Sequence, residues 1–100
     1  MGDPRRLLVM ADYFVDPVWL RTVDGRGSVS LRLERLSLSE GLIVRLRAWA
    51  ARFDALQHSD YDWPDEATRM QWTEEGSRLT DEVRDELGPD YDVQYFQEQP

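Results

Sequence analysis

The residue types that could carry out chemistry gather in one polar stretch near the middle of the chain. It combines the single histidine with carboxylates and two large aromatic side chains, namely His58, Asp60, Tyr61, Asp62, Trp63, Asp65 and Glu66. A calcium loop starting at Asp60 would need Gly at its sixth position and Glu at its twelfth, where this chain has Asp65 and Gln71. One imidazole without a thiolate is also too little for a transition-metal site. We therefore expect no metal and no cofactor.

The same stretch is better suited to holding a protein partner. Tyr and Trp are favoured anchors in protein interfaces, and carboxylates around them would steer a basic partner towards the surface. The candidate partner-binding residues are Tyr61, Asp62, Trp63, Asp65 and Glu66. In the alternative interpretation, Trp63 belongs to the core beneath two helices and the acids cap the helix that follows. The burial of Trp63 distinguishes between the two.

The sequence offers little to an enzyme. His58 is the one imidazole base for six serines, and no Gly-x-Ser-x-Gly elbow is present. The run Gly25-Arg26-Gly27 lacks the spacing of a phosphate-binding loop and indicates a turn. Asp12, at the end of a predicted strand, could be a catalytic carboxylate, although such a residue more often accepts local backbone hydrogen bonds. We expect no catalytic residue and no enzymatic activity.

Charge is distributed unevenly along the chain. Residues 1–50 hold eight Arg against six acidic residues, whereas residues 51–100 hold four against fourteen, and the whole chain carries −8. An acidic half repels phosphate backbones and attracts basic proteins, so nucleic acid is not an expected partner. The alternative is that the acids serve solubility alone.

The composition also bears on the compartment. The chain contains no Cys, which removes disulfides and thiolate chemistry. The apolar run that follows Arg5 and Arg6 is too short for a signal peptide or a membrane span. We expect a cytoplasmic protein with no membrane contact.

The elements that must position these residues begin with strands. A chain of 100 residues has room for one core, and we expect a single α+β domain over residues 1–100, with 97–100 a frayed tail. An apolar run predicts a strand over residues 6–13. Two further strands, over 17–23 and 28–35, flank the turn residues 24–27 and form a hairpin. The strand at 17–23 is the least regular of the three.

The periodicity then changes to that of helices. Ser37 and Glu40 form a capping box ahead of an amphipathic helix that ends near Gln57, with its stripe at Leu42, Leu46, Trp49, Phe53 and Leu56. Pro64 suits the first position of a second helix, with its stripe at Trp72, Gly76, Leu79, Val83 and Leu87. Gly76 would let a neighbouring element approach closely, and Gly88-Pro89 ends the helix.

A last strand follows, in which Tyr91, Val93 and Tyr95 alternate with polar residues. The order is therefore β-β-β-α-α-β. A small, mainly antiparallel sheet with two antiparallel helices packed on one face would bury both stripes, which is an α+β layer arrangement.

Several short segments together resemble a family of small uncharacterised single-domain proteins from high-GC bacteria. They are Val9-Met10-Ala11-Asp12-Tyr13, Pro17-Val18-Trp19, Leu36-Ser37-Leu38-Ser39, Arg47-Ala48-Trp49-Ala50, Phe53-Asp54 and Glu86-Leu87-Gly88-Pro89-Asp90. The resemblance covers most of the chain and implies a coherent domain, but no activity. In size and charge the chain is also similar to immunity proteins that neutralise toxins, a likeness of type and not of motif.

Three functions of different classes remain. The first is an acidic protein-binding module, immunity-like or an adaptor, that engages a basic partner. The second is a structural protein that forms a symmetric homodimer through a strand edge or an apolar helix face. We therefore expect either a monomer or a homodimer. The third and least favoured is an enzyme that uses Asp12, His58 or clustered carboxylates on an unknown small molecule.

Overall fold

A computed structural model of the chain describes residues 5–12, 14–22, 26–60 and 62–96. The predicted tail at 97–100 lies outside these residues. The strands are β1 (Arg5–Val9), β2 (Val18–Arg21), β3 (Ser28–Leu31) and β4 (Tyr91–Tyr95), and the α-helices are α1 (Glu40–Asp54) and α2 (Glu66–Leu87). Short 3-10 helices lie at η1 (Leu33–Arg35), η2 (Ala55–Ser59) and η3 (Gly88–Asp90). The α+β class and the order β-β-β-α-α-β are confirmed.

The four strands form one sheet in the order β3-β2-β1-β4. β2 pairs antiparallel with both β1 and β3, and β4 pairs parallel with β1. The sheet is thus mainly antiparallel, as predicted. Leu7 lies opposite both Leu20 and Val93, which places these apolar side chains on one face.

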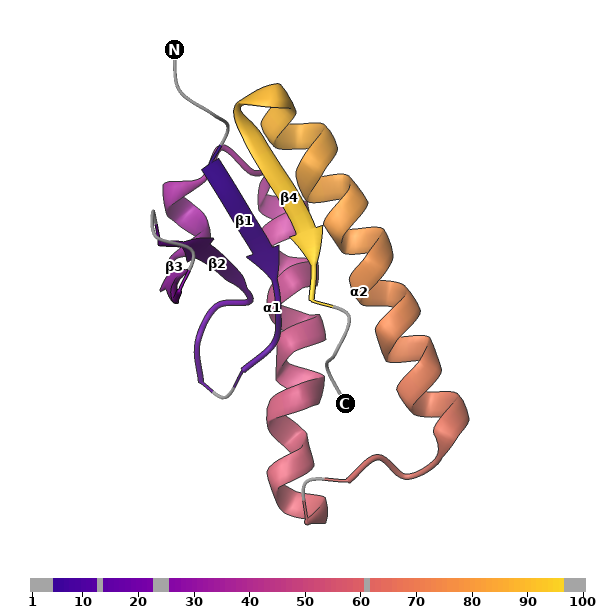
Figure 1. The fold of residues 1–100 in the computed structure, drawn as a ribbon. Helices are drawn as coiled ribbons and strands as arrows, with labels where there is room; N and C mark the ends of the chain where they lie inside the picture. Colours follow the sequence, from indigo (N-terminus) through magenta and orange to yellow (C-terminus); the bar gives the residue numbers. More distant parts are fainter. Residues whose placement is uncertain (1–4, 13, 23–25, 61, 97–100) are drawn as a thin grey trace.

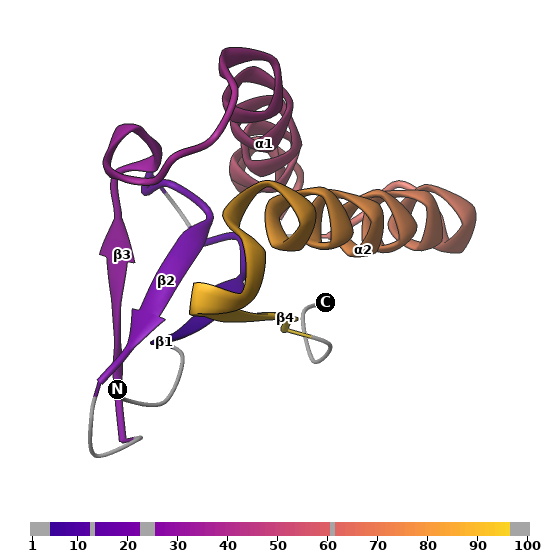
Figure 2. The ribbon, with the colours of Figure 1, turned by 90° about the horizontal axis from the view of Figure 1, so that it is seen from above.

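Both helices cover that face, and α2 runs back beside α1 in the opposite direction (Figures 1 and 2). The core between the two layers includes fully buried Leu7 and Val18 from the sheet and Leu46, Trp49 and Trp72 from the helices. None of the helices within the described segments is long and apolar enough to cross a membrane.

β1 and β3 each end four residues before the predicted end, and β2 (Val18–Arg21) is shorter than the predicted strand over 17–23. β1 ends at Val9 and not at residue 13, because the chain turns back towards β2 through Phe14, whose φ is 63°. β3 ends at Leu31 and not at residue 35, because the amide of Leu33 donates to the carboxylate of Asp16 at 3.1 Å and η1 begins there. Leu33 is nevertheless fully buried.

The start of α1 is capped by Ser39 and not by Ser37. The Ser39 hydroxyl accepts the amide of Leu42 at 3.3 Å. The carboxylate expected from Glu40 is supplied instead by Glu86 near the end of α2, which accepts the Ser39 amide at 2.6 Å and its hydroxyl at 2.8 Å. The capping box is therefore completed between two helices, which ties the start of one to the end of the other.

Two tryptophans, one from each helix, pack and hydrogen-bond α1 against α2. Their indole planes stack at 4.4 Å between centroids. The Nε1 of Trp49 donates to the Trp72 carbonyl, and the Nε1 of Trp72 donates to the Trp49 carbonyl, both at 2.9 Å. Both indoles are fully buried yet retain their hydrogen bonds, as a buried polar group requires. Gly76 lies against Trp49 and Tyr95, which confirms the predicted close approach.

Candidate protein-binding surfaces

Of the two aromatic residues of the 61–66 stretch, the structure describes Trp63, which packs in part against the core. Tyr61 lies outside the described residues. Trp63 is partly buried, and its ring lies 5.1 Å from that of Trp72. Its buried Nε1 has no hydrogen-bond partner within the described part of the chain. Trp63 therefore packs against the core on one side, and only part of its surface remains for a partner.

The acids of the stretch also have roles within the fold. Asp65 is the N-cap of α2, where its carboxylate accepts the amide of Thr68 at 2.7 Å. Hydrogen bonds from the backbone and side chain of Thr68 lower the pKa of Asp65. Pro64 therefore precedes the cap and is not the first helical residue. Glu66 pairs with Arg69 at 2.6 Å, which lowers the pKa of Glu66. Asp62 is exposed. The proposal that these residues contact a partner stays a prediction.

The two residues considered for catalysis lie on different segments. Asp12 is exposed in the loop after β1, and His58 is exposed in η2 beyond the end of α1. No group of three or more metal-ligating side chains occurs among the residues that the structure describes.

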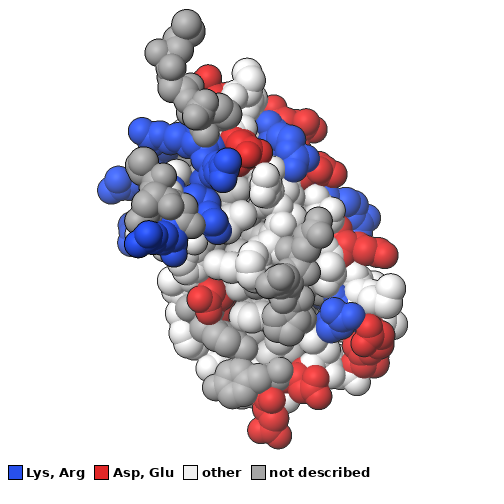
Figure 3. All heavy atoms as spheres, in the orientation of Figure 1, with Lys and Arg blue, Asp and Glu red and all other residues white. Residues whose placement is uncertain are grey.

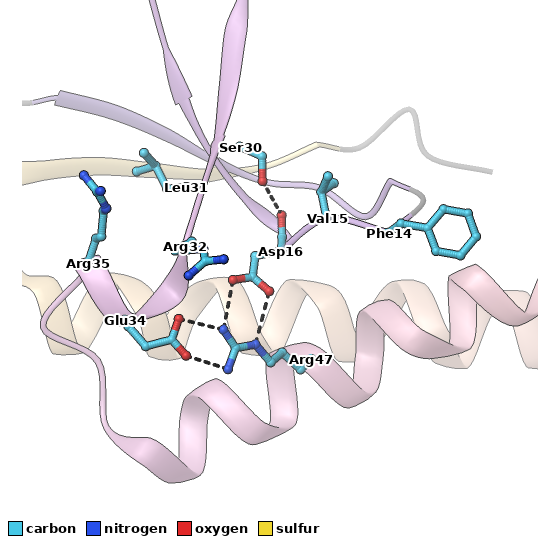
Figure 4. Close-up of a pocket in the computed structure, with 9 residues that line it drawn as sticks. All are labelled: Phe14, Val15, Asp16, Ser30, Leu31, Arg32, Glu34, Arg35 and Arg47. Carbon is cyan, nitrogen blue, oxygen red and sulfur yellow. Dashed lines mark hydrogen bonds and ion pairs between the residues drawn. The ribbon is translucent and has the colours of Figure 1, made fainter.

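The structure reveals a hollow that the sequence did not indicate. It has a volume of about 780 Å³ and lies between the β3 strand, η1, the middle of α1 and the loop that precedes β2 (Figure 4). Its lining consists of Phe14, Val15, Asp16, Ser30, Leu31, Arg32, Glu34, Arg35 and Arg47. Apolar and charged side chains thus meet in one concave surface.

An ionic cluster forms one wall of the hollow. Arg47 of α1 holds Asp16 through Nε at 3.1 Å and Nη2 at 3.0 Å, and holds Glu34 through Nη1 and Nη2, both at 2.7 Å. Hydrogen bonds to this guanidinium lower the pKa of Asp16 and bring the pKa of Glu34 down to about 2, while the carboxylates raise the pKa of Arg47. One cation therefore fixes two carboxylates, and the three together carry one negative charge.

The part of the rim next to Asp16 is apolar and exposed. Phe14 has 74% of its surface exposed and Val15 has 39%. The backbone of Phe14 is in the left-handed region, with φ at 63°, which few residues other than glycine adopt. Its amide donates to the Asp54 carboxylate of α1 at 3.2 Å. The loop is thus attached to the helix layer in a conformation that presents the ring outwards (Figure 4).

A family profile decides the class of protein. The profile described as "Serratia CdiI immunity protein-like" matches residues 5–98. The chain belongs to this immunity protein family. The immunity-like character expected from its size and charge is therefore confirmed at the level of the family. A search of curated proteins finds no match. A high-GC bacterial origin stays an expectation.

This member of the immunity family has two surfaces of different charge. Arginine side chains gather over the end of the sheet where β1 begins, whereas acidic side chains follow α2 and the opposite end of the molecule (Figure 3). Several of these acids are paired, either between the helices or within α2. Glu82 binds Arg45 at 2.7 Å and Glu75 binds Arg52 at 3.0 Å, whereas Glu66 and Asp81 bind arginines three residues further along α2.

The sequence held a weak signal for the hollow. Phe14 and Val15 extend an apolar segment beyond the end of β1, directly before Asp16-Pro17. An aromatic residue in a short connection between strands is a signal for an exposed anchor. Nothing in the spacing, however, places Asp16 and Glu34 beside Arg47, because these pairs are 31 and 13 residues apart in the chain.

Proposed function

We propose that this protein neutralises a toxin by binding it directly, without catalysing a reaction, in the cytoplasm of the cell that makes it. The observation that carries this proposal is membership of the immunity protein family over residues 5–98. A binding role also suits a domain whose indole pairs, caps and ion pairs fix one rigid surface.

The toxin is a protein of net positive charge. Support comes from the net charge of −8, which favours encounter with basic proteins. Seven acidic residues and three arginines lie on α2, so this helix supplies about half of the excess negative charge. Opposite net charges accelerate association and raise specificity more than they raise affinity.

A rescue selection tests the proposal and isolates the toxin in the same step. A library of genomic fragments from the native host is expressed under an inducible promoter in a laboratory bacterial strain. Each fragment is tested with this protein and with an empty vector. The expected result is at least one fragment that stops growth alone and is tolerated when this protein is present.

The selected fragment product is then purified and mixed with this protein. Light scattering is expected to show a stable complex of defined stoichiometry, and calorimetry a saturable binding isotherm. A control strain carries Gly76→Trp, which cannot fit against the Trp49 and Tyr95 rings and removes the folded protein. If no toxic fragment is rescued, or if rescue occurs without a complex, direct neutralisation is wrong.

A further inference from the structure

The hollow beside β3 has features that the stability of the fold does not account for. Phe14 and Val15 are apolar, yet they are exposed at the surface, where they add little to the core. Phe14 also adopts a φ of 63°, a conformation that costs free energy for a residue with a side chain. Such strained positions concentrate at functional sites, and an exposed aromatic ring is a favoured interface anchor.

The wall of the hollow is fixed before any partner arrives. Arg47 holds Asp16 and Glu34, the Asp16 carboxylate accepts the Leu33 amide at 3.1 Å, and Ser30 donates to the Asp16 carbonyl at 3.0 Å. These contacts connect α1, η1, β3 and the loop. A preformed concave surface loses little conformational entropy on binding, which favours affinity.

The charge of the hollow differs in sign from that of the molecule. Arg32 and Arg35 line it in addition to Arg47, against the carboxylates of Asp16 and Glu34, so the lining is net positive in a chain of −8. Within the described residues, neither Arg32 nor Arg35 forms an ion pair, although the charge of Arg32 acts on Glu34. The hollow is therefore complementary to a carboxylate next to an apolar side chain.

The 61–66 stretch is less suited to be the central contact. Trp63 lies partly in the core, Asp65 caps α2 and Glu66 is paired with Arg69. Binding a partner there would disturb interactions that already hold the fold. These acids can still attract a basic protein from a distance.

We propose that the toxin docks in the hollow, placing an apolar side chain against Phe14 and Val15 and a carboxylate beside Arg32 and Arg35. This inference rests on the proposed function. The toxin as a whole is basic, but the segment that enters the hollow is apolar and acidic. The net charge of the immunity protein brings the two proteins together, and the hollow holds them.

Two variants test the docking surface with the toxin product recovered by rescue. Phe14→Ala removes the anchor, and Arg32→Glu with Arg35→Glu reverses the local charge. Each is expected to weaken Kd about 30-fold or more, as loss of an interface hot spot does. Met70→Ala and Arg78→Glu are the matched controls, because they alter an exposed apolar residue and an exposed arginine on α2. Both controls are expected to bind within about threefold of the wild type.

Hydrogen exchange supplies a second measurement that does not depend on variants. Amides of residues 14–16 and 30–35 are expected to become protected in the complex, and those of residues 66–70 are expected to change little. Retained affinity in both hollow variants, with normal circular dichroism and unfolding, would overturn the docking site and leave neutralisation intact. Protection confined to residues 62–70, or loss of binding in the controls, would assign the contact to α2 instead.

Self-association is the remaining occupant. If light scattering shows a dimer of this protein alone and Phe14→Ala converts it to a monomer, the hollow is an interface between two copies, and toxin docking there is wrong. Failure of the wild type to bind any rescued toxin would instead overturn the proposed function.

Discussion

At the scale of single residues, one glycine sets how closely α2 can approach the rest of the core. A Cβ placed on Gly76 would lie 2.6 Å from Cζ2 of Trp49 and 2.7 Å from Oη of Tyr95. The Trp49 ring cannot move easily, because it is stacked on Trp72 and hydrogen-bonded through its Nε1. The Tyr95 hydroxyl is buried and desolvated there, which raises the pKa of Tyr95 to about 12. The position therefore admits no side chain without a shift of the helix.

Gly76→Ala is accordingly expected to destabilise the protein by about 1–3 kcal/mol, the usual range for overpacking a core, despite the better helix propensity of alanine. The free energy of unfolding from urea titration measures it. Gly41→Ala is the control, since nothing lies within 4 Å of a Cβ at this exposed position of α1. The control is expected to be neutral or slightly stabilising. Equal stability of both variants would mean that the two rings are not packed as described.

At the scale of elements, Arg47 connects α1 with η1 and with the loop before β2. The pKa of Glu34 is lowered from 4.5 to about 2, chiefly by its hydrogen bonds to Arg47, and that of Asp16 is lowered as well. A carboxylate whose pKa is lower in the folded state stabilises the fold fully above its ordinary pKa. That contribution is lost as the pH falls through the folded-state value. The side chains of Arg47 and Glu34 are 43% and 58% exposed, so solvent screening keeps the effect small.

The urea concentration at the unfolding midpoint is therefore expected to decrease as the pH is lowered from about 4.5 to about 2. This decrease should be less steep in Arg47→Gln than in the wild type. Unfolding curves at about pH 5.5, 4 and 2.5 measure the difference. Other carboxylates contribute to the same slope, so only the comparison between proteins is informative. Arg78→Gln, which removes an exposed arginine outside the cluster, should retain the wild-type slope. Parallel curves for the wild type and Arg47→Gln would contradict the role of Arg47.

The elements themselves were predictable because their signals are local. The fold class, the order of the elements and the face of the sheet that the helices cover were predicted from two local patterns. These are the apolar helix stripes that end in Leu56 and Leu87 and the alternation of Tyr91, Val93 and Tyr95 with polar residues. The caps were less predictable. The cap of α1 at Ser39 is completed by Glu86, 47 residues away, so the predicted local capping box at Ser37 was wrong.

The hollow was not predicted either, because its contacts also join residues that are far apart in the chain. Its wall depends on Arg47 reaching Asp16 across 31 residues and on a positive φ at Phe14, and neither has a pattern in the sequence. The 61–66 stretch stood out because its residue types are conspicuous in sequence. The fold, however, uses Asp65 for capping and part of Trp63 for packing. Residue type indicates what chemistry is available, and only the packing shows which groups remain free for a partner.

At the scale of the whole molecule, charge and shape have separate roles in binding. The acids of α2 and of the 61–66 stretch are not among the residues that line the hollow. Under the proposed function, we therefore expect them to act on a partner mainly through the long-range field. Such a field changes the rate of association and is screened by salt, whereas buried contacts set the rate of dissociation.

For the rescued toxin we therefore expect the association rate to fall about tenfold or more between about 20 and 500 mM salt, with little change in dissociation. Surface plasmon resonance measures both rates. The combined variant Asp62→Asn, Asp65→Asn and Glu66→Gln should lower the association rate several-fold at low salt and leave dissociation unchanged. Asn at position 65 keeps the N-cap of α2, so the fold is preserved. Phe14→Ala should do the opposite and accelerate dissociation. An association rate that does not change with salt would mean that the acids do not attract the partner at a distance. Faster dissociation in the acid variant would mean that the acids form the contact itself.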